Sequence, residues 1–357
     1  RRGTGTPMER VVFHDSASAV GAEVKAPLAH VALPILYDPN ANGLEDERHI
    51  ALTEGSSIGK RYRVEKTIGT GTFSRVVACH DSYCGQSVSV KVMKNDKECL
   101  DAGLGEVRVL ARLAQLDPQG QLPIIRLHDY FYLKEHLFIA TELCCDTLNT
   151  FGRHLDQEGR RHTYFTSDCI ASLCHQMCSA LAFLHENGIV HCDVKTDNVC
   201  ILSTSRKMFK LIDFGSAVMN NDPRNSYVQS RPYRAPEVML GMNWGSKVDL
   251  WSLGAMIPEL VLGAPIFLAP TLAQVLASIV AVAGPVPPAM ARACSNLSSM
   301  VMTSDGEMFE VEPKGTVVTL QPRSNVDLSS LLREADSAPL VDFTAALLTV
   351  DPARRIS

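Results

Sequence analysis

Residues 191–199 read HCDVKTDNV. This stretch places an acid, a lysine and an amide within one polar loop that follows an apolar helical pattern. Asp193 can accept or orient the proton of an attacking hydroxyl, and Lys195 can offset charge on a phosphoryl group in transfer. Asn198 can bring a neutral oxygen to a divalent cation. The loop therefore predicts a phosphoryl-transfer site.

A second acidic motif follows this loop. Asp213 lies in the sequence LIDFG, between apolar strand residues and a glycine that can act as a hinge. Its carboxylate is a suitable ligand for Mg²⁺. Further on, residues 235–237 read APE. The motifs occur in an order that is hard to meet by accident: Lys91, Glu106, Asp193, Asn198, Asp213 and APE.

The part of the chain before this loop has the pattern of an antiparallel sheet. From residue 61, the runs YRVEKTIG, SRVVACHD and QSVSVKVMK are short and rich in β-branched residues. The runs IIRLHDYFYL and HLFIATEL read as two further strands, and LGEVRVLARLAQL has apolar residues at helical spacing. These patterns predict a five-stranded sheet with one helix.

A loop of small residues separates the first two predicted strands, where residues 69–74 read GTGTFS. Such a loop can close backbone N–H groups over a phosphate chain, although a glycine pair in a hairpin is also typical of an ordinary turn. Lys91 lies in an apolar strand and needs an anionic partner, which Glu106 on the following helix can supply. Together they can hold phosphate oxygens; the alternative is a solvated lysine at a sheet edge.

The second half of the chain is mainly helical in pattern. Thr166 or Ser167 can cap a helix that ends near Gly188. A short strand pair (CIL and FKLID) follows the polar loop, and later helices include PLVDFTAALL. Residues 293–333 are mixed and serine-rich, which indicates an insert.

Composition narrows the class of protein. The 357 residues are 46% hydrophobic and 20% charged, which is typical of a folded chain of two lobes. A net charge of -5 argues against nucleic-acid binding. The 11 cysteines form no C-x-x-C pair, so we expect reduced thiols in the cytoplasm or nucleus. The first residues show no signal-peptide pattern.

One uncharged stretch, residues 260–284, approaches the length of a membrane span. Pro265 and Pro270 fall inside it, and a proline within a helix costs about 3 kcal/mol or more. We therefore expect two core helices joined by a loop, and no membrane association.

Over about residues 61–357 the chain resembles the protein kinases. HCD in place of HRD, the run YVQSRPYRAPE and DFGSA are similar to the dual-specificity tyrosine-regulated kinases, the DYRK family. The lead-in YDPNANGLEDE from residue 37, with GTGTFSRVV, is most similar to the plant and algal branch of that family.

The resemblance implies an α+β, bilobal protein-kinase fold. Residues 1–57 would form a partly ordered extension, 58–143 an N-lobe with the five-stranded sheet and one main helix, and 144–357 a mainly helical C-lobe. The family uses ATP and Mg²⁺, phosphorylates Ser/Thr of protein substrates, and phosphorylates its own activation-loop tyrosine, here Tyr227. We expect a monomer.

The resemblance also assigns roles to single residues. Asp193 and Lys195 would be catalytic, with Asn198 and Asp213 on the metal. Glu237 would pair with Arg355, and Asp249 would accept N–H bonds from the catalytic loop. Thr141 stands where the family usually has a bulkier aromatic at the back of the adenine pocket. The implied ATP-binding residues are Ile68, Gly69, Gly71, Val76, Lys91, Glu106, Thr141, Glu142 and Cys144.

Two arginines follow Tyr227 and support a regulatory role for it. A phosphotyrosine carries nearly two negative charges, which Arg231 and Arg234 can pair with to order the loop. The alternative is an ion pair between these arginines and a nearby carboxylate. Cys192 replaces the arginine that most kinases place before the catalytic acid, so Arg231 and Arg234 must do this work alone.

Several departures from the family pattern leave an alternative open. Ser74 replaces the third glycine of the phosphate loop and costs about 1–2 kcal/mol if the backbone there needs a positive φ. Thr196 and Asp197 stand where Pro-Glu is common, Pro258 interrupts a helix, and the chain ends before the usual last helix. The alternative function is a pseudokinase that binds partners without turnover. A small-molecule phosphotransferase fits less well, because APE and the tyrosine-bearing loop serve kinases of proteins.

Overall fold

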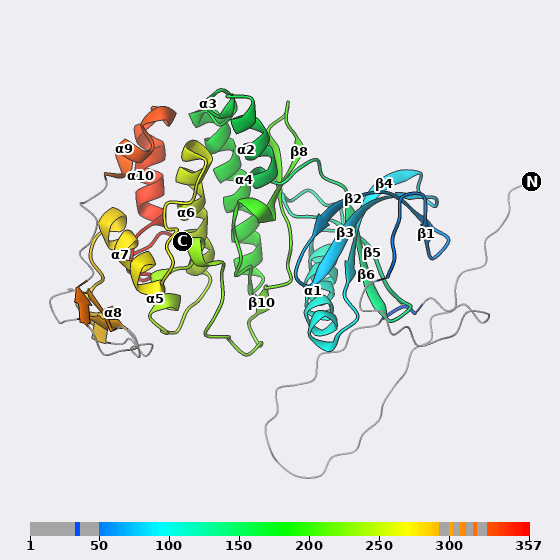
Figure 1. Cartoon of the computed structure of the whole chain (residues 1–357), viewed down its shortest axis with the longest axis horizontal. Helices are drawn as coiled ribbons and strands as arrows, with labels where there is room; N and C mark the ends of the chain where they lie inside the picture. The colour runs from blue at the N-terminus through cyan, green and yellow to red at the C-terminus, as the bar shows by residue number, and fades with distance from the viewer. Residues whose placement is uncertain (1–32, 36–49, 293–299, 303–307, 312–316, 320–326) are drawn as a thin grey trace, which may run out of the picture. The chain divides into compact units, whose positions relative to one another are not determined.

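The computed structural model describes residues 33–35, 50–292, 300–302, 308–311, 317–319 and 327–357. The chain forms two compact units, coloured from blue to red along the chain in Figure 1. The first unit comprises Arg1–Ala111 and Leu127–Leu143, and the second comprises Arg112–Arg126 and Cys144–Ser357.

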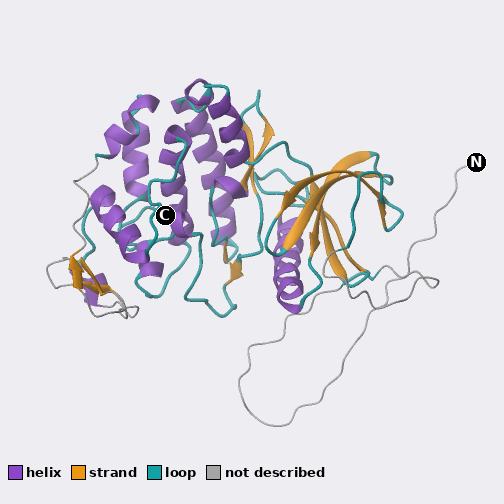
Figure 2. Cartoon of the chain, in the orientation of Figure 1, coloured by secondary structure: helices purple, strands orange, loops and turns teal. Residues whose placement is uncertain are grey.

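The first unit contains a six-stranded antiparallel sheet, drawn in orange in Figure 2. The five predicted strands are present, and a two-residue strand, too short to show a pattern, is added at one edge. The order across the sheet is β1-β2-β3-β4-β6-β5. The strands are β1 (Ser57–Ile58), β2 (Tyr62–Thr70), β3 (Ser74–Asp81), β4 (Gln86–Met93), β5 (Leu127–Leu133) and β6 (His136–Glu142).

The predicted helix α1 (Lys97–Leu116) packs closely on this sheet. At Gly103 a Cβ atom would lie 2.7 Å from the Leu137 side chain and 2.8 Å from that of Met93. Since real Cβ contacts are not that short, the glycine lets the helix approach the sheet. This close approach brings Glu106 of α1 next to Lys91 of β4.

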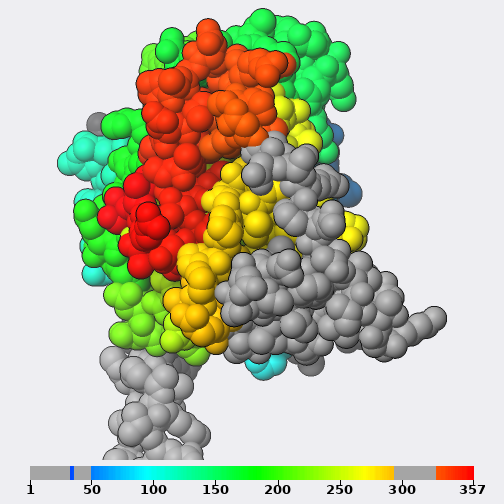
Figure 3. Space-filling view, turned by 90° about the vertical axis from the view of Figure 1, so that its left-hand side faces the viewer, coloured from blue at the N-terminus to red at the C-terminus, as the bar shows by residue number. Residues whose placement is uncertain are grey.

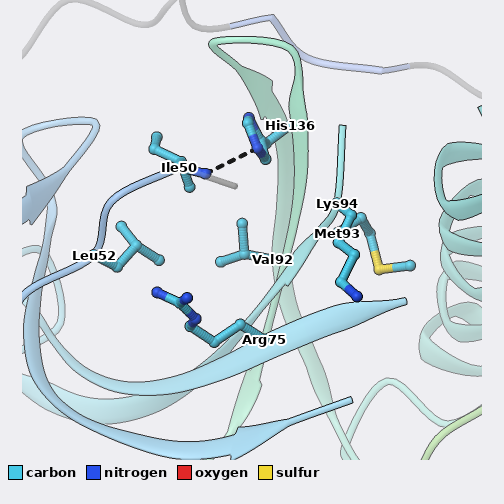
Figure 4. A pocket seen from close by; sticks show the side chains of 7 residues that line it. All are labelled: Ile50, Leu52, Arg75, Val92, Met93, Lys94 and His136. Carbon is cyan, nitrogen blue, oxygen red and sulfur yellow. Dashed lines mark hydrogen bonds between the residues drawn. The ribbon is translucent and has the colours of Figure 1, made fainter. Parts of the chain in front are cut away.

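The opposite face of the sheet carries an apolar cluster that includes Val90 and Val92. Ile50 and Leu52 pack against it, and the Ile50 N–H donates to His136 Nε2 at 3.1 Å. A small hollow lies beside this contact (Figure 4). Successive residues of a strand point to opposite faces, so Val92 lies toward the hollow and its neighbour Lys91 lies on the other face.

The second unit is built around helix α6 (Lys247–Leu262), in which every residue from Val248 to Val261 is buried. Because it is buried on all sides, neighbouring helices surround it. These and the other helices of the unit are α2 (Leu148–Gln157), α3 (Arg161–Tyr164), α4 (Ser167–Glu186), α5 (Pro236–Met239), α7 (Leu272–Ala283), α8 (Pro288–Arg292), α9 (Leu328–Leu331) and α10 (Ala338–Leu347).

The uncharged stretch 260–284 forms the end of α6, a connecting segment and α7. The prediction of two helices joined by a loop is therefore confirmed. Within the described parts of the chain, none of the helices has the length and apolar character that crossing a membrane requires. The prediction that Pro258 interrupts its helix is wrong, because α6 runs through it. Burial of the surrounding turns offsets the cost of the lost hydrogen bond.

The polar loop lies between short strands that fix both of its ends. Helix α4 begins after Thr166, whose side chain accepts from the Cys169 N–H, and the chain turns at Gly188 with a φ of +72°. Strand β7 (Ile189–Val190) then leads into the loop, and β8 (Val199–Ser203) leaves it. The predicted pairing of β8 with β9 (Met208–Leu211) is confirmed, and β7 pairs with β10 (Val218–Met219).

The predicted insert, residues 293–333, lies largely outside the described residues. Its described parts include three short strands, β11 (Met300–Met302), β12 (Met308–Val311) and β13 (Val317–Thr319), which form an antiparallel sheet.

Figure 3 shows the face on which the C-terminal residues (red) lie beside α7 (yellow). A hollow there is lined by Val282, Ala283, Leu348 and Asp351, among others. Neither of these two hollows is lined by a residue predicted for the site.

Candidate active site

The small-residue loop of the first unit closes the hairpin between β2 and β3. The Gly71 N–H donates to the Ser74 carbonyl at 2.8 Å. A Cβ atom at Gly69 or Gly71 would come no closer than 3.9 Å or 3.7 Å to other atoms, and neither residue has a positive φ. The protein's own packing therefore does not demand glycine here. Glycine keeps the backbone accessible to a group that approaches it closely, as a phosphate chain does.

Ser74 does not carry the backbone strain considered for it. It is the first residue of β3, lies opposite Met93 of β4, and is absent from the residues with positive φ. Its side chain is buried. An extended backbone accepts any L-residue, so the cost of about 1–2 kcal/mol for a left-handed residue does not arise at this position.

Lys91 and Glu106 lie together in the first unit. The Lys91 ammonium is 2.8 Å from Glu106 Oε2, and the Glu106 side chain is only 6% exposed. Strand β4 lies between β3 and β6, so Lys91 is not at an edge of the sheet. A buried carboxylate costs free energy unless it is paired, and Lys91 supplies the pairing charge. This pair presents an oriented ammonium on one face of the sheet.

The other residues of the first unit that are predicted to bind ATP lie on β2, β3 and β6 and in the loop between β2 and β3. Gly69 lies opposite Val76 in the β2–β3 pairing, and Ile68 is 45% exposed. Thr141 and Glu142 are the last residues of β6, where Thr141 lies opposite Ser89 of β4. Cys144 is the residue at which the chain passes into the second unit.

The Asp193 carboxylate has a complete set of donors in the second unit. Its Oδ2 accepts from Lys195 Nζ at 2.6 Å and from Asn198 Nδ2 at 3.0 Å. Its Oδ1 accepts from the hydroxyl and the N–H of Ser230, at 2.7 Å and 3.0 Å. Ser230 was not predicted from the sequence; only its position between Tyr227 and the APE motif indicates it. Four donors fix the direction in which this carboxylate points.

Asp249 holds the backbone of the polar loop, residues 191–199. Its fully buried carboxylate accepts from the N–H groups of His191 and Cys192, each at 2.9 Å. The His185 ring nitrogen lies 2.9 Å from the same carboxylate, a contact that the sequence analysis missed. Cys192 has a φ of 64°, which is uncommon for a residue with a side chain. The bonds to Asp249 offset the cost of this conformation.

Asn198 and Asp213 lie on adjoining segments. The Ile212 N–H donates to the Asn198 carbonyl at 2.9 Å, and the His191 ring bonds to the Ile212 carbonyl at 3.0 Å. The Asn198 amide nitrogen is used by Asp193, so its side-chain oxygen is the atom left for a cation. Asp213 has a φ of 61°. One carboxylate and one amide oxygen are a donor set that suits Mg²⁺ completed by phosphate and water.

Tyr227 lies next to the two arginines predicted to accompany it, and Arg234 lies over its ring. Its side chain is 65% exposed, and the Arg234 guanidinium carbon is 3.9 Å from the ring centroid. Hydrogen bonding by Arg234, its charge, and a weaker contribution from Arg231 lower the pKa of the Tyr227 hydroxyl below its ordinary value. Among the described residues, neither arginine forms an ion pair with a carboxylate. Positive charge therefore gathers at the tyrosine oxygen.

Glu237 and Arg355 form a buried ion pair. Two guanidinium nitrogens of Arg355 lie 2.7 Å and 2.9 Å from the Glu237 oxygens, and the side chains are 0% and 1% exposed. Arg355 also donates to the carbonyls of Thr349, Lys247 and Val350. The pair joins α5, which contains Glu237, to the segment after α10.

Most of the chain matches a known family of proteins. The model of the protein kinase domain matches residues 62–357, so the chain belongs to the protein kinase family. Among its curated relatives is the dual specificity protein kinase lkh1 of Schizosaccharomyces pombe, 30% identical over 92% of this chain and 50% of the relative. The serine/threonine-protein kinase ppk5 of the same yeast is 33% identical over 88% of this chain and 36% of the relative.

The relatives also include members of the DYRK group. The dual specificity tyrosine-phosphorylation-regulated kinase 2 of Drosophila melanogaster is 29% identical over 88% of this chain and 42% of the relative. The predicted resemblance to this group of kinases is confirmed. The chain spans half or less of the length of these three relatives.

Proposed function

We propose that this chain is an ATP-dependent protein kinase domain that transfers the γ-phosphoryl group of Mg-ATP to Ser/Thr hydroxyls of protein substrates. The observation that carries the proposal is the Asp193 carboxylate, held by donors from Lys195, Asn198 and Ser230. A carboxylate oriented in this way can take up or direct the proton of an attacking hydroxyl. Lys195 offsets charge on the transferred group.

Residues 58–143 would act as the N-lobe, and residues 144–357 would act as the C-lobe. The loop that contains Gly69 and Gly71 would cover the phosphates, and Lys91, held by Glu106, would bind their oxygens. Asn198 and Asp213 would hold Mg²⁺, whose charge offsets that of the phosphate oxygens. Adenine would contact Ile68, Val76, Thr141, Glu142 and Cys144.

A turnover assay tests the proposal. The recombinant chain with Mg-ATP and a set of Ser/Thr peptides is expected to give ADP and phosphopeptide. A chain that binds nucleotide but gives no phosphopeptide would instead support the pseudokinase alternative. The presence of Lys91, Asp193 and Asp213 favours turnover. The cytoplasmic or nuclear location, the monomeric state and the membership of the plant and algal branch stay predictions. The same holds for protein substrates of this chain.

Glu106→Gln is expected to lower kcat/KM for ATP about tenfold, because Lys91 loses the charge that orients it. Steady-state kinetics with varied ATP measures the change. Glu98→Gln is the matched control, since Glu98 is exposed in the first turn of the same helix. Equal kinetics for Glu106→Gln and wild type would remove Lys91 from the proposed role.

Autophosphorylation of Tyr227 is the regulatory part of the proposal. A phosphate on this exposed side chain would meet the guanidinium of Arg234 and that of Arg231. Charge-assisted bonds of this kind order a loop. The loop in question leads directly to Ser230, which binds Asp193.

Tyr227→Phe is expected to give a protein with one phosphate fewer and several-fold lower peptide phosphorylation, because the charge that orders the loop is missing. Intact mass spectrometry before and after phosphatase treatment measures the first effect, and initial rates measure the second. Tyr83→Phe is the control, since Tyr83 is 74% exposed and lies in the first unit. An unchanged phosphate count in Tyr227→Phe argues against this site.

A further inference from the structure

A buried hydrogen-bonded cluster lies next to the catalytic loop in the second unit. The Thr196 hydroxyl donates to Glu259 Oε1 at 2.9 Å, and the Tyr233 hydroxyl donates to Glu259 Oε2 at 2.6 Å. The two hydroxyl oxygens are 3.3 Å apart. All three residues are buried, with Glu259 8% exposed. Each oxygen of the carboxylate thus has its own donor.

The cluster is costly to break. Burial raises the pKa of the Glu259 carboxyl above its ordinary value, and the hydrogen bonds from Tyr233 and Thr196 offset only part of this rise. Asp197 adds a charge that raises this pKa, and Arg161 adds one that lowers it. Removal of one donor leaves a buried carboxylate oxygen unpaired, which costs more than the bond itself contributes. The cluster therefore fixes the positions of the segments that carry its members.

Those segments are the two that hold the Asp193 carboxylate. Thr196 directly follows Lys195, and Tyr233 comes three residues after Ser230. Both Lys195 and Ser230 donate to Asp193, and Lys195 Nζ also donates to the Ser230 hydroxyl at 3.0 Å. Glu259 on α6 supplies the common anchor behind them.

A neighbouring residue ties the second segment to the same helix. Gln229 is buried with a φ of 66°, and its amide nitrogen donates to Ser252 Oγ at 2.7 Å and to the Val248 carbonyl at 3.0 Å. Its amide oxygen accepts from the Ala235 N–H. The segment that carries Ser230 is thus fixed on α6 at both ends, by Gln229 before it and by Tyr233 after it.

We propose that Thr196 is a positioning residue. Its hydroxyl joins the catalytic loop to α6 through Glu259 and so keeps both Lys195 and Ser230 hydrogen-bonded to Asp193. The inference rests on the proposed kinase function. Thr196 does not touch the reacting groups itself. Its effect falls on the rate of the chemical step rather than on binding of ATP.

Thr196→Val removes the hydroxyl and keeps the shape of the side chain. It is expected to lower kcat about tenfold with an unchanged KM for ATP, and Thr196→Ser is expected to restore kcat to within about twofold of wild type. Thr344→Val is the matched control, because it removes an equally buried hydroxyl that bonds to the Leu340 carbonyl within α10. Steady-state kinetics of the three variants and wild type provides the comparison.

Amide hydrogen exchange of the same variants gives a readout that does not need turnover. Peptides that cover residues 193–198 and 229–233 are expected to exchange faster in Thr196→Val than in Thr344→Val or Thr196→Ser. Unchanged kcat together with unchanged exchange in both peptides overturns the inference, as does loss of kcat that Thr196→Ser fails to restore. If wild type gives no phosphopeptide while exchange rises as expected, the proposed function fails and the coupling between the two segments stands.

Discussion

Asp193→Asn is expected to reduce peptide phosphorylation by about 10²–10⁴-fold, the usual contribution of a positioned general base. An amide of the same size keeps the shape of the side chain but cannot take up the proton of the attacking hydroxyl. It also weakens the charge-assisted bond from Lys195 Nζ, which lies 2.6 Å from the carboxylate. Initial rates with a peptide substrate at saturating Mg-ATP measure the loss.

Two further measurements make this result specific. Nucleotide binding, followed by calorimetry, is expected to stay within about threefold of wild type, because Asp193 is not among the residues proposed to contact ATP. Asp101→Asn is the matched control, since Asp101 lies on the exposed side of α1 beside Lys97. A rate for Asp193→Asn close to that of Asp101→Asn would falsify the assignment of Asp193.

Arg355→Met is expected to lower the free energy of unfolding by about 3–5 kcal/mol, the effect of leaving a buried charge without its partner. The Glu237 carboxylate, 1% exposed, would keep its charge in a site that water does not reach. Three backbone carbonyls would lose a donor as well. Urea denaturation followed by circular dichroism measures the change in midpoint and slope.

The neighbouring residue provides the control for this prediction. Arg354 is exposed, so Arg354→Met removes the same charge at the same end of the chain with an expected effect within about 0.5 kcal/mol. The double variant Glu237→Leu with Arg355→Met is expected to regain part of the lost stability, because neither charge remains. If Arg355→Met and Arg354→Met unfold at the same urea concentration, the buried pair contributes nothing measurable.

The strands and helices predicted from the sequence share one property. Each has a local residue pattern strong enough to indicate its structure without knowledge of its tertiary contacts. The β-branched runs of the first unit and the Thr166-capped helix α4 both appear where expected. The wrong prediction at Pro258 has the opposite cause. Burial of α6 on all sides is a tertiary effect, and it overrides the preference of a single residue.

The candidate site divides in the same way. Asp193, Asn198 and Asp213 stand in short motifs, so the sequence alone was enough to predict them as site residues. Ser230 and His185 reach their carboxylates from 37 and 64 residues away, and no spacing rule links positions so distant. The hydrogen bond of the Thr196 hydroxyl could not be predicted for a related reason, because its partner Glu259 lies 63 residues further along the chain.

The alternation of side chains along β4 limits changes in chain length as well as changes in residue type. Lys91 occupies one face of the strand while Val90 and Val92 fill the apolar cluster on the other. Insertion or deletion of a single residue in β4 ahead of Lys91 would exchange the two faces and drive the ammonium into the apolar cluster. Homologous chains are therefore expected to differ in length in the turn between β3 and β4, and to keep the number of residues from Gln86 to Lys91 constant.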